Sequence, residues 1–377
     1  MANGSGVSET QIFKYVLYQI EGSVMLLFNA TIVITILWHT SLRNRKEYIV
    51  IGSLALVDSM QGSALLAAGV HRMHKIMFGT DTQLWTMWQC LLTYHCFMWL
   101  FSDPLAGLML SVVSIDRLIA VLWPSKYIKF RMSYAFTLVG IPFVYMFCSG
   151  LFGIYLSYTH SDKAEHRSVC FTSSSLPGTF YNYHKWMQIL GAFASVVLYG
   201  FVMFFFNHKA NKVAAAGIPK RDQKTSRAKV SRGDNLMQRK LTKSMGLSAI
   251  ATYFLYVMPT LLDPISVYWK DSITNDQFAM IQVYSNAFSQ LNPILNLVIY
   301  ISRLAPIRIG VKQMLLCQGQ LPYNLDLLEA TNITTKQQQN SKLKARRYAE
   351  TEADKHISTV KDAYQQQLRV ESVASGM

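Results

Sequence analysis

Seven long apolar segments dominate this chain of 377 residues and limit what it can fold into. A helix needs about 20 consecutive, mostly apolar residues to cross a lipid bilayer. One such segment could be the buried helix of a soluble protein, but seven of them, separated by polar loops, predict an all-α membrane protein with a bundle of seven transmembrane helices. The segments are Tyr15–Trp38, Tyr48–Val70, Trp88–Val121, Tyr134–Tyr158, Trp186–Asn207, Ser244–Tyr268 and Phe278–Ile301. The third is longer than one span requires, so its start is the least defined boundary.

The distribution of lysine and arginine predicts the orientation of the bundle. Cytoplasmic loops of membrane proteins carry an excess of these residues. With the N-terminus outside, 29 of the 36 Lys and Arg fall on the inner side and 7 on the outer side, and without the tail the ratio is still 18 to 7. The prediction is therefore an extracellular N-terminus (residues 1–14), a membrane domain (15–317) and a polar cytoplasmic tail (318–377) without stable structure.

The composition excludes several other classes of protein. Only 15% of the residues are charged, against about 25% in a typical soluble domain. The net charge of +15 would suit a nucleic-acid-binding protein, but the basic run Lys209–Lys243 lies between two predicted spans and has no aromatic residues on which bases could stack. A positive inner loop beside anionic lipid explains this charge. Five cysteines without close pairs exclude a disulfide-rich scaffold and a zinc ribbon.

A short amphipathic segment follows the seventh predicted span. In Arg303–Cys317, apolar residues recur at helical spacing while Arg308 and Lys312 take polar positions. This pattern predicts an eighth helix lying on the inner surface of the membrane lipid, and Pro306 fits its first turn. Cys317 at its end is either a palmitoylation site or a plain reduced thiol.

The inner end of the third predicted span carries the most informative motif. From Ser114 to Tyr127 the chain reads SIDRLIAVLWPSKY. An Asp-Arg pair alone could be a charge pair at the membrane interface. With Pro124 and Tyr127 at these distances, the segment resembles the rhodopsin-like G-protein-coupled receptors, whose third helix ends in Asp-Arg-Tyr followed by Pro and Tyr. Leu118 replaces the first of those tyrosines here.

Further motifs fall in the spans where this family has them. They are Asn29 in the first span, Asp58 in the second, Pro259 in the sixth, and Asn292-Pro293 in the seventh. The segments Ser114–Val121 and Gln238–Ser244 also resemble nematode serpentine chemoreceptors in amino-acid sequence, most of all the Srsx group.

The resemblance implies a receptor, not an enzyme, that activates a heterotrimeric G protein on binding a small-molecule or peptide ligand. It also implies a chemosensory role, a plasma-membrane location that extends to sensory cilia, and arrestin as a further partner of the tail. The residues that it implies in coupling and activation are Asp116, Arg117, Pro124, Tyr127, Pro259, Asn292 and Pro293. A sodium ion or water network, the single cofactor expected, is implied at Asn29, Asp58, Ser289 and Asn292. Alternatively, these four residues bind no ion and only form polar contacts that hold the helices together.

The chain departs from the family pattern at three activation positions. Asn296 replaces the Tyr of the seventh-helix motif, so the part of that motif in activation is in doubt. Val257 stands where the family has a Trp, two residues before Pro259. Arg239 stands where many members place an acid that binds the Arg of the third helix. Asp116 is then the expected partner of Arg117, and a low barrier to activation follows.

The expected ligand pocket lies among the third, fifth, sixth and seventh helices. Asp103 is its ionisable candidate, one helical turn deeper than Trp99, the position that holds the ligand-binding Asp in amine receptors. Asp103 could pair with a cationic ligand, or it could be a structural acid bonded to a neighbouring helix. The expected aromatic walls are Trp99, Phe193, Tyr284 and Phe288, although such residues in membrane helices more often serve packing.

The resemblance also implies a disulfide between Cys170, in the second outer loop, and the top of the third helix. The family register falls on Leu92, so Cys90 and Cys96 are both candidates, and Cys90 is the expected partner because it lies nearer the membrane edge. On the same side, Asn3-Gly-Ser is a glycosylation sequon.

Two other hypotheses have less support. His71 and His74 have a spacing that can hold a metal, but no third ligand accompanies them, so no metal site is expected. A seven-helix transporter or channel is the alternative function. Transporters often show inverted repeats and broken helices at the midplane, and no repeat is visible in the sequence.

Overall fold

Five helices in the described part of the chain are long and apolar enough to cross a membrane. The computed structural model describes residues 9–161, 163–215, 246–261 and 275–316, all within one compact unit. The five helices are α1 (Glu9–Trp38), α3 (Lys46–Met77), α5 (Tyr94–Leu122), α7 (Met132–Thr159) and α9 (Gly178–Ala215). All but α5 contain one predicted span and extend past it, because the helix continues through polar residues that the apolar pattern does not include.

The third predicted span is wrong at its start. Trp88–Val121 does not form one helix, because a short helix α4 (Met87–Leu91) ends before α5 begins. Thr86 and Gln89 form a reciprocal capping box at the start of α4, and the Thr93 hydroxyl donates to a carbonyl of α4 (2.7 Å). These side chains satisfy backbone groups at the helix ends, which lets the chain turn here.

Short elements connect the spans. They are α2 (Thr40–Arg43), α6 (Pro124–Lys129), α8 (Thr172–Ser175) and the antiparallel strands β1 (Leu84–Trp85) and β2 (His166–Arg167). The register of the strand pair sets Leu84 opposite Arg167 and Trp85 opposite His166. The pair therefore fastens the segment before α4 to the segment before α8.

The sixth predicted span, Ser244–Tyr268, is described over an apolar helix at Gly246–Leu261. This helix contains a π-helical turn, η1 (Tyr253–Val257), shortly before Pro259. The rest of the predicted span lies outside the described residues.

The seventh predicted span lies inside α12 (Asn275–Arg303). A helix α13 (Ala305–Leu315) follows, and a bend of 93° separates it from the stretch Ala287–Ser302. Helix α13 covers most of the predicted amphipathic segment, while its place on a membrane surface stays a prediction.

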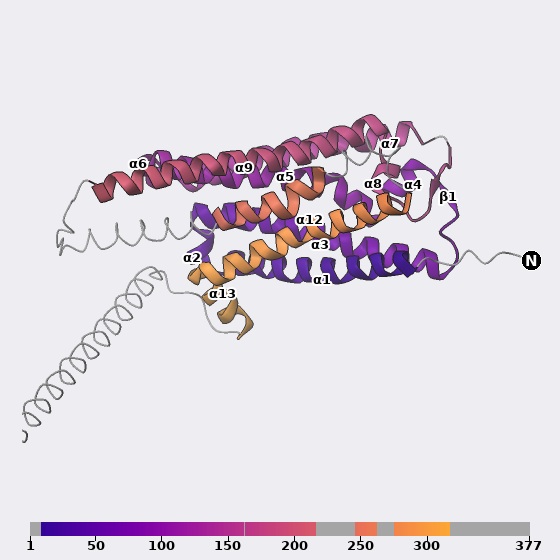
Figure 1. Cartoon of the computed structure of the whole chain (residues 1–377), viewed down its shortest axis with the longest axis horizontal. Helices are drawn as coiled ribbons and strands as arrows, with labels where there is room; N and C mark the ends of the chain where they lie inside the picture. Colours follow the sequence, from indigo (N-terminus) through magenta and orange to yellow (C-terminus); the bar gives the residue numbers. More distant parts are fainter. Residues whose placement is uncertain (1–8, 162, 216–245, 262–274, 317–377) are drawn as a thin grey trace, which may run out of the picture. The chain divides into compact units, whose positions relative to one another are not determined.

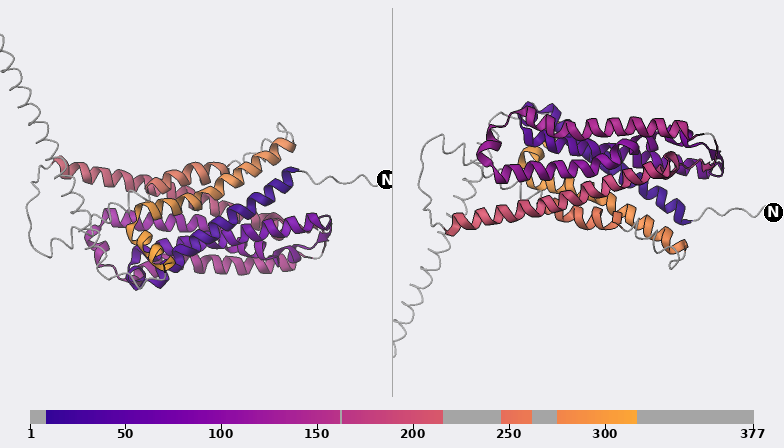
Figure 2. Two further views of the ribbon diagram at one scale, coloured as in Figure 1. Left: turned by 90° about the horizontal axis from the view of Figure 1, so that it is seen from below. Right: turned by 90° about the horizontal axis from the view of Figure 1, so that it is seen from above.

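Helix α5 is the centre of the described bundle. It packs against α3, α7 and α9, while α1 packs against α3, α12 and α13 (Figures 1 and 2). Glycine lets backbones meet directly at two of these contacts. A Cβ on Gly107 of α5 would lie 2.3 Å from the Gln188 carbonyl oxygen of α9, and one on Gly62 of α3 would lie 2.6 Å from the Leu26 amide of α1. Small residues serve the same purpose at helix contacts in membrane proteins generally.

Candidate functional site

Asp116 and Arg117 are buried at the end of α5 that leads into α6, with exposed fractions of 1% and 0%. Arg117 Nε donates to Asp116 Oδ2 (2.9 Å), and its Nη2 forms an ion pair with the same oxygen. Nη2 also donates to the Tyr127 hydroxyl (2.9 Å), which in turn donates to Asp116 Oδ1 (3.1 Å). A buried ion pair needs such additional hydrogen bonds to offset its desolvation. Asp116, Arg117 and Tyr127 are called the Arg117 cluster below.

Helix α6 brings Tyr127 to the ion pair. The helix starts at Pro124, where a fixed φ suits the first turn and a missing N–H costs nothing. The Tyr127 ring packs edge-on against Tyr134, with 6.1 Å between ring centroids. Burial raises the pKa of Tyr127, so its hydroxyl stays protonated and donates to Asp116. Three residues predicted for coupling, Asp116, Arg117 and Tyr127, are therefore bonded to one another, and a fourth, Pro124, starts the helix that carries Tyr127.

Lys46 belongs to the same region, although in the sequence it is only one of the 29 positive charges predicted on the inner side. It is the first residue of α3 and is 8% exposed. Its ammonium lies 4.0 Å from the centroid of the Tyr127 ring. No local signal marks this contact, because it joins segments far apart in the chain.

The polar residues predicted at mid-membrane are all buried. Asn29, Asp58, Ser289 and Asn292 are each less than a tenth exposed. They lie on α1, α3 and α12, and α1 packs against both of the other helices. Carboxylate, amide and hydroxyl oxygens are the ligand type that hard cations take. The chemistry of these side chains therefore fits a sodium ion.

Side-chain hydrogen bonds connect the sixth helix to α12. Thr252 donates to Asn292 Oδ1 (3.0 Å), and one turn away Ser248 donates to Asn296 Oδ1. Asn296, which replaces the family's Tyr, is thus part of an interhelical polar contact. The sequence did not predict this pairing, because Ser248 and Thr252 belong to no motif.

Both predicted prolines lie within helices. Pro259 follows the π-helical turn η1, and its carbonyl accepts a hydrogen bond from Ser285 of α12. Pro293 is buried inside α12. Because proline cannot donate the usual helical hydrogen bond, both positions interrupt the hydrogen bonding of helices that contact each other.

Asp103 has a partner on a neighbouring helix. Gln61, a buried residue of α3, donates to Asp103 Oδ1 (3.3 Å). Trp99, one turn away on α5, is partly buried and packs beside Arg72, whose guanidinium carbon lies 5.6 Å from the ring. The contact with Gln61 favours the structural reading of Asp103.

Two expected pocket walls are corrected by the structure. Phe193 and Phe288 are each 50% exposed. Phe193 shares an exposed apolar face of α9 with Leu190 and Val197, and Phe288 shares one of α12 with Leu291 and Leu295. The faces of α9 and α12 that point into the bundle carry buried polar residues instead, such as Ser195 and Ser289. Helix α9 is apolar on every side along its membrane-spanning part, so its sequence does not show which face points inward. The side chain of the fourth wall, Tyr284, lies outside the described residues.

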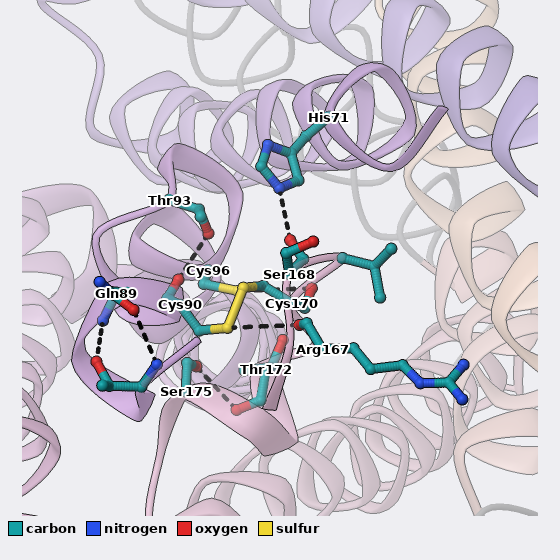
Figure 3. Close-up of a disulfide and its surroundings, with 12 residues drawn as sticks. His71, Gln89, Cys90, Thr93, Cys96, Arg167, Ser168, Cys170, Thr172 and Ser175 are labelled. Atoms are coloured by element: carbon teal, nitrogen blue, oxygen red, sulfur yellow. Dashed lines mark hydrogen bonds between the residues drawn. A yellow bond between two sulfur atoms is a disulfide. The ribbon is translucent and has the colours of Figure 1, made fainter. Parts of the chain in front are cut away.

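A disulfide joins Cys90 of α4 to Cys170, which confirms the expected pairing (Figure 3). The Cα atoms are 5.3 Å apart, within the usual range of about 4.4–6.8 Å. Cys96 is a buried free thiol that packs beside the bridge. The break between α4 and α5 separates the two candidate cysteines, since Cys90 lies before it and Cys96 after it.

Arg72 of α3 holds the loop that contains Cys170. Its Nε donates to the Val169 carbonyl (3.1 Å) and its Nη2 to the Cys170 carbonyl (2.8 Å). The guanidinium carbon also lies 4.4 Å from the Phe171 ring. This residue is 2% exposed, although in the sequence it is only one of the 7 positive charges predicted on the outer side.

Two histidines contact the same loop. His95 binds the Cys170 carbonyl (3.2 Å). His71 binds the Ser168 carbonyl (3.0 Å), as Figure 3 shows. A carbonyl only accepts, so each of these ring nitrogens carries a proton. His71 therefore has a structural partner, and within the described ranges no group of three ligating side chains that could hold a metal occurs.

Three sequence expectations fall on residues that the structure does not describe: Asn3, Arg239 and Cys317. Of these three, only Arg239 lies within the range that a known family matches. The family model described as 7 transmembrane receptor (rhodopsin family) matches residues 28–300, which include the Arg117 cluster, the buried polar residues and the disulfide. No curated protein matches the chain.

Proposed function

The chain belongs to the rhodopsin family of seven-transmembrane receptors, and from this we propose that it is a ligand-activated receptor that couples to a heterotrimeric G protein. Members of this family are multi-pass membrane proteins that act as signalling receptors and not as enzymes. Membership therefore favours a receptor over the transporter or channel that the sequence left open.

The observation that carries the proposal is the Arg117 cluster. Arg117 is fully enclosed and bonded to Asp116 and Tyr127. A G protein that docks at this end of the bundle reaches Arg117 only after these bonds are broken. A ligand shifts such an equilibrium by its difference in affinity for the two arrangements. Since Arg239 replaces the acid that often binds this Arg from the sixth helix, the cluster is the main restraint that we expect.

The same proposal covers the ligand and the location. We infer a small, externally sensed molecule, supported by the similarity to nematode serpentine chemoreceptors and by the partly buried Trp99 of α5. The corresponding location is the plasma membrane, extending to sensory cilia. At the other end, α13 would lie on membrane lipid with Cys317 palmitoylated, and arrestin would bind the tail.

We also propose that Asp58 holds a sodium ion or a water network together with Asn29, Ser289 and Asn292. Support comes from the burial of all four residues on helices that pack together. Intramembrane carboxylates usually face the interior of a bundle and have a function there.

The test of the main proposal is Arg117→Ala. We expect normal surface expression and loss of ligand-dependent guanine-nucleotide exchange, because Asp116 keeps its hydrogen bond to Tyr127 while the coupling side chain is gone. Arg131→Ala is the matched control, since this exposed arginine lies at the same end of the bundle. The agonist comes from a ligand screen with a promiscuous G protein. Undiminished exchange in Arg117→Ala, or a ligand-dependent ion flux, would contradict the assignment.

A further inference from the structure

We propose that Lys46 is a positioning residue for activation. By binding the last turn of α6, it holds Tyr127 against the Asp116–Arg117 ion pair. This role rests on the proposed function, since it concerns how the resting arrangement of the receptor is maintained.

Helix α6 cannot hold its own shape. It has 6 residues, Pro124–Lys129, whereas isolated helices shorter than about 12 residues are marginal in water. The last carbonyls of any helix also lack partners within it. Contacts with the rest of the protein must therefore supply both the stability of α6 and the missing hydrogen bonds.

Lys46 contributes to both. Its Nζ donates to the Tyr127 carbonyl and to the Phe130 carbonyl (3.3 Å), two of the groups at the C-terminal end of α6. The ammonium also lies 4.0 Å from the Tyr127 ring centroid and 5.9 Å from that of Phe130. A cation is favourable at a helix C-terminus because the peptide dipoles point their negative ends there.

Tyr127 is thereby held at two points. Lys46 of α3 binds its backbone, and Asp116 and Arg117 of α5 bind its hydroxyl. Without the ammonium, the Tyr127 carbonyl keeps the Phe130 amide as a donor (3.2 Å), but the last turn of α6 loses its contact with α3, so the hydroxyl is held less firmly against the ion pair. Arg117 then has one bond fewer to break before it can meet a G protein. Removing the ammonium should therefore raise signalling in the absence of ligand.

The first experiment measures basal nucleotide exchange in membranes with matched surface expression. Lys46→Met removes the ammonium and keeps the apolar stem, and we expect about a tenfold rise, since a hydrogen bond to a charged group contributes at least the 1.4 kcal/mol that corresponds to tenfold. Lys46→Arg should restore the basal rate. Arg43→Met is the matched control, because it removes one exposed positive charge from the same loop. Equal basal rates in Lys46→Met and Arg43→Met would overturn the proposal.

A double-mutant cycle shows whether Lys46 acts through Tyr127. Tyr127→Phe removes only the hydroxyl that joins the ion pair. If Lys46 works by placing that hydroxyl, Lys46→Met should raise the basal rate no further in the Tyr127→Phe background. Additive effects of the two substitutions would mean that Lys46 acts by another route.

A third measurement does not depend on coupling. Hydrogen exchange of the backbone amides at 125–130 should be about tenfold faster in purified Lys46→Met than in Lys46→Arg, with unchanged rates in the middle of α3 and α5. Unchanged exchange at 125–130 would refute the contact itself. If the wild type shows no nucleotide exchange under any condition, the proposed function fails, while this measurement still decides on Lys46. Lys46→Gln replaces Lys46→Met in every assay if the latter does not fold.

Discussion

Asp103 lies within the membrane-spanning part of α5 and accepts a hydrogen bond from Gln61 of α3 (3.3 Å). A charged carboxylate is costly at such a depth unless it is paired. A protonated carboxylic acid and an Asn side chain can both donate and accept hydrogen bonds. Loss of the charge would therefore abolish the binding of a cationic ligand by Asp103, whereas a hydrogen bond that joins α5 to α3 would be retained.

We expect Asp103→Asn to shift the potency of a cationic and a neutral agonist by the same small factor, because Asn retains a hydrogen bond with Gln61. The measurement is a pair of dose–response curves at matched expression. A loss of about 2–5 kcal/mol confined to the cationic agonist is what truncating a buried charge pair costs. That outcome would show that Asp103 anchors the ligand.

Single side chains were predictable where a motif placed them. The motif from Ser114 to Tyr127 was enough to propose Asp116, Arg117 and Tyr127 together, and the structure brings them into one cluster. Lys46 could not be found this way, since its contact depends on how α3 and α6 pack. Phe193 was misplaced because apolar residues surround α9 on every side, and the sequence alone does not show which of them meet lipid.

Helices α5 and α9 meet along a stripe of small residues. Gly107 and Gly191 face each other closely enough that a Cβ on either would clash with the opposite backbone. Beside them, Ser111 donates to the Gly191 carbonyl (2.6 Å), and Ser114 and Ser195 share a hydrogen bond (2.9 Å). The contact thus depends on backbone proximity and short polar side chains, not on interlocking large residues.

Gly107→Ala should destabilise the receptor by about 1–3 kcal/mol, because the added methyl group meets the backbone of α9 and forces the helices apart. Gly200→Ala is the control in α9, where a Cβ has open space and Ala should be neutral or stabilising by up to about 1 kcal/mol. The measurement is the thermal denaturation temperature of the purified receptor in detergent. Equal temperatures for the two variants would mean that α5 and α9 do not touch at Gly107.

The loop after α7 depends on its disulfide. Cys90→Ser and Cys170→Ser should each reduce surface delivery, since losing a native disulfide costs about 2–5 kcal/mol. Cys96→Ser should do so less, because its thiol only packs beside the bridge. Surface labelling of intact cells compares the three variants. A peptide that links Cys170 to Cys96 in mass spectrometry of the wild type would contradict this assignment.

Whole elements were more predictable than their ends. Spans of apolar residues identified α1, α3, α7 and α9 because a bilayer demands a minimum apolar length. The ends depend on local chemistry that hydropathy ignores, such as the Thr86–Gln89 capping box that makes α4 a separate helix. Helix α9 also continues through Lys209 and Lys212 to Ala215, well past its apolar stretch.

For the molecule as a whole, the charge distribution predicts that the N-terminus is extracellular. Asn3 should then carry a glycan, and Asn3→Gln should abolish the mobility shift that a glycosidase causes on a denaturing gel. Asn332→Gln is the control, because its sequon lies in the predicted cytoplasmic tail. A shift that persists in Asn3→Gln and disappears in Asn332→Gln would reverse the predicted orientation.

The contact of Gly107 with α9 also has a mechanical consequence. Because the two backbones are in direct contact at Gly107 and Gly191, we expect α9 to pivot at this point if it tilts against α5. From Gly191, α9 extends about 20 Å toward Gly178 and about 36 Å toward Ala215. A tilt of about 10° would move the longer arm by about 6 Å and the shorter by about 3.5 Å, from a rise of 1.5 Å per residue. The displacement at Ala215 would therefore be nearly twice the displacement at Gly178. The end of α9 that moves further is the one toward Arg117.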